Sequence, residues 1–123
     1  MHKVVYNSCH GGFALSLQAI DWLEENCKDE NLRKIIKKAK EDSLYSVLQR
    51  NMYICGEISR WFHDERHHTD LVAVVEALGK EASGFCADLA IEEISGRQYR
   101  IDDYDGAEDV ITPKDSDWVF IND

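Results

Sequence analysis

Apolar side chains recur every three or four residues through most of the first 80 positions, and this period predicts helices. One helix is expected from residue 17 with Ser16 as its N-cap, and a second from about residue 31. A third apolar stripe begins near residue 43, whereas residues 51–62 mix helix-forming and β-branched residues. Thr69 or Asp70 is expected to cap a last helix, which Gly79 ends.

Shorter apolar runs separated by turn residues predict strands at the start of the chain and in its last third. Turns are expected at Gly96, at Asp105-Gly106 and at Thr112-Pro113. The expected strands cover residues 3–7, 87–94, 98–104, 110–112 and 118–121. This order predicts an α+β fold, in which the N-terminal strand and several helices pack on a small, mostly antiparallel sheet built from the C-terminal third.

The size and charge of the chain narrow the classes of function. Its 123 residues fit a single domain over 1–123, and 44% hydrophobic residues suffice for a core. There are 24 acidic against 14 basic residues, a net charge of −10, which argues against binding a nucleic-acid backbone. Residues 81–123 alone carry 12 acidic and 3 basic residues, so the acid is concentrated there. That third is either a solvated face or a patch for a basic partner.

Nothing in the sequence predicts a membrane, secretory or cofactor-binding protein. No apolar run reaches the length of a membrane span, and residues 1–7 lack the layout of a signal peptide. The cysteines Cys9, Cys27, Cys55 and Cys86 form no C-x-x-C pair, so free thiols are expected and no metal or other cofactor. We therefore expect a cytoplasmic setting.

Several blocks of the chain carry a family likeness. They are VVYNxCxGGFxLS at residues 4–16, RH at 66–67, LVxVVExLG at 71–79, ASG at 82–84, LxIxEI at 89–94 and YDGxE at 104–108. Together they resemble a family of small proteins encoded mainly by bacteriophages and some giant viruses. The chain departs from that family at His68-Thr69, where the family usually reads Asp-Pro, so the usual helix cap is missing.

The resemblance implies a viral origin and the cytoplasm of a host cell, and it implies no reaction. We therefore expect a small acidic binding protein, a counter-defence or host-takeover factor whose partner is a host protein or a small anionic, nucleotide-like ligand. A minor structural component of the virion is an alternative. Self-association into a homo-oligomer stays open.

The turn Cys9-His10-Gly11-Gly12 is the segment most suggestive of a site, because it joins a strand to a helix. Free amides at such a junction can receive an anion. The residues expected to bind a ligand are Asn7, Cys9, His10, Gly11, Gly12, Phe13, Arg66, His67, Arg97, Arg100 and Tyr104. A purely structural interpretation is that the two glycines only let the chain turn tightly while the thiol packs inside.

Two enzymatic interpretations stand beside binding as alternatives. In the first, Cys9 acts as the nucleophile of a hydrolase or transferase, with His10 or His67 as its base. In the second, His63 and His67 lie on one helical face as metal ligands, although surface histidines explain that spacing as well. Neither forms a complete catalytic set, so binding is the expected activity.

Overall fold

The computed structural model describes residues 1–41 and 47–113, with the side chains of 47–50 left out. The expected cap near residue 43 and the expected strand over 118–121 lie outside this part of the chain. The described elements are β1 (His2–Asn7), α1 (Leu17–Asn26), α2 (Glu30–Glu41), α3 (Val47–Phe62), α4 (Thr69–Leu78), a 3₁₀ turn η1 (Gly79–Ala82), β2 (Leu89–Ile94), β3 (Arg100–Tyr104) and β4 (Ala107–Ile111). The predicted α+β class is confirmed.

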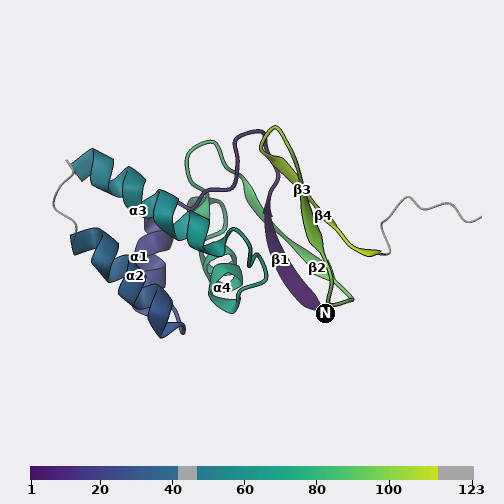
Figure 1. Cartoon of the computed structure of the whole chain (residues 1–123), viewed down its shortest axis with the longest axis horizontal. Coiled ribbons are helices and arrows are strands. Elements are labelled where there is room, and N and C mark those ends of the chain that lie inside the picture. The colour runs from purple at the N-terminus through teal and green to yellow at the C-terminus, as the bar shows by residue number, and fades with distance from the viewer. Residues whose placement is uncertain (42–46, 114–123) are drawn as a thin grey trace, which may run out of the picture.

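The elements form three layers, with the helices on one side, the β1–β2 pair in the middle and the β3–β4 hairpin on the other side (Figure 1). β1 and β2 are antiparallel, with Val5 opposite Ile91. β3 and β4 are antiparallel as well, with Ile101 opposite Val110. The sheet expected from the C-terminal third is therefore divided into two strand pairs.

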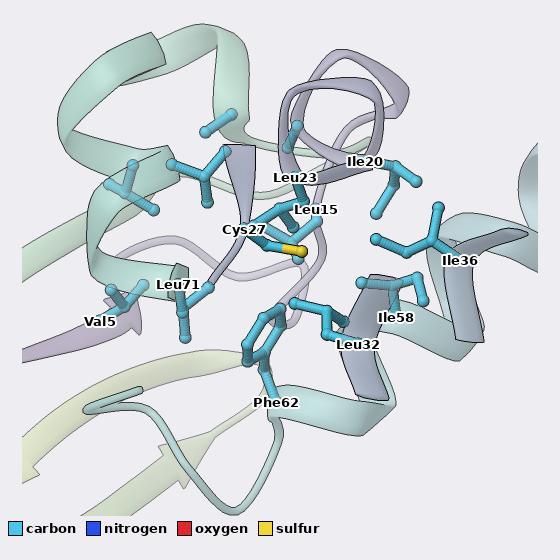
Figure 2. Packing of buried hydrophobic residues seen from close by; sticks show 14 of the residues in the cluster. Val5, Leu15, Ile20, Leu23, Cys27, Leu32, Ile36, Ile58, Phe62 and Leu71 are labelled. Carbon is cyan, nitrogen blue, oxygen red and sulfur yellow. The ribbon is translucent and has the colours of Figure 1, made fainter. Parts of the chain in front are cut away.

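The main core lies between the helices and one face of the β1–β2 pair. Val5, Leu23, Leu32, Ile58 and Leu71, one from each of β1 and the four helices, are all fully buried there. Figure 2 shows these side chains pointing toward one another, with the Cys27 sulfur among them. The helical period seen in the sequence is thus the period of burial. Residues 51–62, which the sequence left open, belong to α3.

A second, smaller core joins the two strand pairs. It holds the buried residues Val4, Ile94 and Val110, with Tyr99 and Ile101 packed against them. Neighbouring residues on a strand point to opposite faces, so Val4 and Val5 place β1 in both cores. β1 is consequently the central structural element, and the helices and the hairpin are both built on it.

The helix ends show which of the predicted N-caps are confirmed by the structure. Ser16 caps α1 as predicted, accepting a hydrogen bond from the amide of Ala19. The prediction that Thr69 or Asp70 caps α4 was wrong, because His68 takes that role through Nδ1, 3.0 Å from the amide of Asp70. Nε2 of His68 lies 3.2 Å from Asp29, and this hydrogen bond is the main cause of a lowered pKa for Asp29.

None of the helices in the described ranges has the length and apolar character that crossing a bilayer requires.

Candidate functional site

Asn7 joins three segments at the carboxyl end of β1. Its side chain is fully buried, and Nδ2 donates to the carbonyls of Cys9 and Gly106, each at 2.7 Å. Its Oδ1 accepts from the amide of Asp88 at 2.8 Å. The amide group therefore holds the glycine turn, the β3–β4 turn and the chain before β2 together. Buried side-chain amides that are satisfied in this way are typical of structural joints.

Arg66 and Glu108 form a buried ion pair beside this joint. The guanidinium donates from Nη1 and Nη2 to the two carboxylate oxygens at 2.6 and 2.8 Å, and Nε donates to the carbonyl of His63. The same guanidinium lies 3.9 Å above the ring centre of Phe13. Both charged side chains are at most 3% exposed. An anionic ligand at Arg66 would have to displace Glu108, so this arginine is positioned to hold the fold.

The glycine turn is packed against neighbouring backbone. The amide of Gly11 donates to the carbonyl of Cys9 at 3.0 Å. A Cβ on Gly11 would lie 1.6 Å from the carbonyl oxygen of Cys86, and one on Gly106 would lie 2.6 Å from the nitrogen of Gly12. These close approaches match the structural interpretation of the glycines, in which a missing side chain lets two backbones meet.

The turn is also separated from the helix that was expected to polarise it. Residues 13–16 lie between the glycines and α1, and within them Leu15 bridges to Ser83. The capping hydroxyl of Ser16 occupies the start of α1. Because the field of a helix end falls off within its first turn, it contributes little at Gly11 and Gly12. The geometry that would make this turn an anion site is not assembled here.

The side chains that a cysteine-dependent enzyme would use, Cys9 with His10 or His67, do not come together either. The Cys9 thiol donates to the carbonyl of Cys86 at 3.1 Å, and His10 packs edge-on against the ring of Tyr104. His67 is instead bonded through Nδ1 to the hydroxyl of Tyr99 at 2.7 Å. Among the described residues, the Cys9 sulfur forms no hydrogen bond with either imidazole. The nucleophile–base hydrogen bond on which such an enzyme depends is therefore missing.

We expect thiol reactivity to follow burial. Cys86 is exposed and Cys27 is buried, and burial raises the pKa of both Cys27 and Cys55. Because the thiolate is the reactive form, iodoacetamide at neutral pH should label Cys86 first and Cys27 last, as read by peptide mass spectrometry over time. A Cys9 that is alkylated much faster than Cys86 would contradict this order and revive the enzymatic interpretation.

The remaining predicted residues lie on the surface. Arg100 is exposed at the first position of β3, opposite Ile111. His63 and His67 lie in the loop between α3 and α4, so the interpretation that placed both on one helical face was wrong. Nowhere in residues 1–41 and 51–113 do three histidine, cysteine or acidic side chains gather around a possible metal position.

A small pocket at the amino end of β1 does unite two of the predicted ligand residues. It has a volume of about 250 Å³ and is lined by His2, His67, Ile94, Arg97 and Tyr99. Sequence reasoning named His67 and Arg97 as ligand residues, and it considered Tyr99 only as part of a strand that could face a partner. His2 was missed, because no local pattern connects it with the others.

A groove that sequence reasoning did not find lies beside α3. It has a volume of about 820 Å³, and its lining comes from α3, residues 13–18 and residues 83–85. We call it the α3 groove. Its lining includes Phe85 and Met52, which are 94% and 69% exposed. The available signal was weak: a lone phenylalanine between glycine and cysteine in a predicted loop.

A comparison with models of known protein families, with curated proteins and with solved structures finds no match for this chain.

Proposed function

We propose that this chain is a binding protein that holds an apolar segment of a partner protein in the α3 groove. The observation that carries the proposal is the exposure of Phe85 and Met52, which both line this groove. A phenylalanine that stays in water forgoes about 1.5–3 kcal/mol of burial energy. Exposed apolar side chains gathered at a concave surface typically mark an interaction site.

The lining of the groove fits an apolar guest. Its lining includes Phe13, Leu17 and Cys55. The hydroxyl of Ser59, which also lines it, is already bonded to the amide of Leu15 and the carbonyl of Cys55. Gly56 faces open space, since a Cβ there would meet nothing within 4 Å. No acidic side chain lines the groove in the described part of the chain, although the protein is strongly acidic. The groove can therefore accept one or two large apolar side chains of a partner.

The acidic residues of the β3–β4 hairpin favour a partner that also carries positive charge. Asp102 and Asp109 stand directly opposite each other on β3 and β4, and both are exposed. Like charges at such positions destabilise a strand pair, so their presence favours a role outside the fold. An acidic face accelerates encounter with a basic protein and loses that effect as salt rises.

The resemblance to viral proteins extends the proposal to the identity of the partner. A viral protein of this size that acts in the host cytoplasm would bind a host protein, as a counter-defence or takeover factor. The groove supplies the contact for such a partner, and the acidic hairpin face supplies the steering.

A photo-crosslinking experiment tests the proposal. With p-benzoylphenylalanine at position 85, we expect one partner to crosslink, and Gly56→Leu should remove that crosslink by filling the groove. The purified partner should then lose about 30-fold in affinity on Phe85→Ser, as typical of an aromatic hot spot. Isothermal titration calorimetry measures this loss.

Tyr104, which is 79% exposed and lies outside the groove, provides the matched control. Tyr104→Ser should change the affinity less than twofold. A crosslink between two copies of this chain would replace the foreign partner by self-association and contradict the proposal. Equal losses from Phe85→Ser and Tyr104→Ser would contradict the groove as the binding site.

A further inference from the structure

The small pocket at the amino end of β1 has a composition unlike that of the chain. Three of its five lining residues are basic or can become so, namely His2, His67 and Arg97. None of the five is acidic, whereas the chain as a whole has 24 acidic and 14 basic residues. The three come from separate segments, so the tertiary structure brings them together. In a protein of net charge −10, this pocket thus gathers one permanently charged and two ionisable basic groups with no acidic lining residue.

Hydrogen bonds within the pocket hold its two imidazoles in place. Nδ1 of His2 lies 3.1 Å from the carbonyl oxygen of Gly96, which only accepts, so that nitrogen carries the proton. Nδ1 of His67 is engaged by the hydroxyl of Tyr99 at 2.7 Å. In both rings Nε2 is therefore the remaining polar atom, and in His2, whose proton lies on Nδ1, it donates to an oxyanion only in the doubly protonated imidazolium form.

Arg97 supplies the permanent charge. Its side chain is exposed, and it enters no ion pair within residues 1–41 and 51–113. This distinguishes it from Arg66, whose guanidinium is neutralised by Glu108. Arginine binds phosphate oxygens in a bidentate manner without losing its charge. An arginine with no acidic partner beside two imidazoles is a suitable receptor for an oxyanion.

The other walls of the pocket are apolar or aromatic. Ile94 belongs to the smaller core, and Tyr99 is half-buried against it. These surfaces can pack against the organic part of a ligand while the basic groups bind its anionic end. The volume of about 250 Å³ lies below the range of roughly 300–1,000 Å³ that is usual for drug-sized ligands, so the ligand is small.

We propose that this pocket binds the phosphate group of a small organic phosphate, with Arg97 and the imidazoles of His2 and His67 around the oxyanion and Tyr99 beside the organic group. The inference is independent of the α3 groove, because the two sites share no lining residue. It places an anion where the sequence expected one for His67 and Arg97, and not at the glycine turn.

Titration of the ¹⁵N-labelled protein with phenyl phosphate tests the proposal. We expect saturable amide shifts confined to residues 2, 67 and 94–99, with inorganic phosphate shifting the same amides but binding more weakly because it lacks the ring. Arg97→Gln should weaken phenyl phosphate about tenfold or more, since it removes a charged hydrogen-bond donor. His67→Gln should weaken it as well.

Arg100→Gln is the matched control, because Arg100 is exposed nearby but does not line the pocket. It removes the same charge and should change the affinity less than twofold. Equal losses from the Arg97 and Arg100 variants would show attraction by net charge alone and overturn the site. An absence of saturable shifts at 10 mM phenyl phosphate would overturn it too, whereas neither result bears on the α3 groove.

Discussion

Glu108→Ala should lower the free energy of unfolding by about 3–5 kcal/mol, because it leaves Arg66 charged and buried without its partner. Arg66 is 1% exposed and cannot reach solvent without opening the contact between the loop before α4 and β4. The same change removes the acceptor of the backbone N–H of Asn7, which donates to Oε1 of Glu108 at 2.8 Å. An unsatisfied buried donor adds its own desolvation cost to that of the unpaired charge.

Urea denaturation followed by circular dichroism measures the effect, with Glu108→Gln and a double variant as controls. Glu108→Gln keeps the size and an acceptor but loses the charge, so it should destabilise the protein less than alanine does. Arg66→Met with Glu108→Leu removes both charges and should regain part of the loss, because a buried ion pair contributes little net stability against apolar groups of similar size. A loss below 1 kcal/mol for Glu108→Ala would mean that Arg66 finds solvent, contrary to the buried pair described here.

Gly11→Ala should lower the free energy of unfolding by about 3 kcal/mol, because the backbone itself must move to admit a methyl group. The added Cβ would lie 1.6 Å from the carbonyl oxygen of Cys86 and 2.7 Å from its Cβ. No flexible side-chain end is available to yield at that point. The loss is therefore expected even in the absence of any ligand, which separates a structural role of this glycine from a role in anion binding.

Gly56→Ala provides a control of opposite sign. Gly56 lies within α3, and a Cβ there would meet nothing within 4 Å. Alanine in a helix is favoured over glycine by about 0.5–1 kcal/mol, so this variant should be more stable than the original chain. Thermal melts of the three proteins measure both shifts. If Gly11→Ala melts at the same temperature as the original chain, the close packing of the glycine turn is refuted.

Patterns among residues close together in the sequence predicted the helices, caps and turns that depend on such short-range interactions. The apolar stripes of α1, α2 and α4 are confirmed, as are the Ser16 cap and the end of α4 at Gly79. Asp105-Gly106 forms the hairpin turn as predicted, with φ angles of 53° and 89°. Such a turn requires positive φ at both central positions, and this need is visible in the dipeptide itself.

For the candidate site, the sequence could indicate which residues take part but not which of them bind one another. Sequence reasoning singled out Asn7, Arg66 and the block that contains Glu108. Nothing in the sequence indicated that Arg66 and Glu108, which are 42 residues apart, form an ion pair. The guanidinium was therefore assigned to a ligand. His68 was overlooked as a cap because histidine is an uncommon cap, and its role depends on Asp29, which lies 39 residues away.

The identity of each element followed from short-range chemistry, since helical period, caps and turns depend on residues within a few positions of one another. Which charges are neutralised, and which surfaces stay open, depended on contacts between segments far apart in the chain. Glu108 neutralises the charge of Arg66 in a buried ion pair, whereas no acidic side chain in the described ranges pairs with Arg97. Two arginines that look alike in the sequence thus differ in role, because burial and partner are properties of the folded chain.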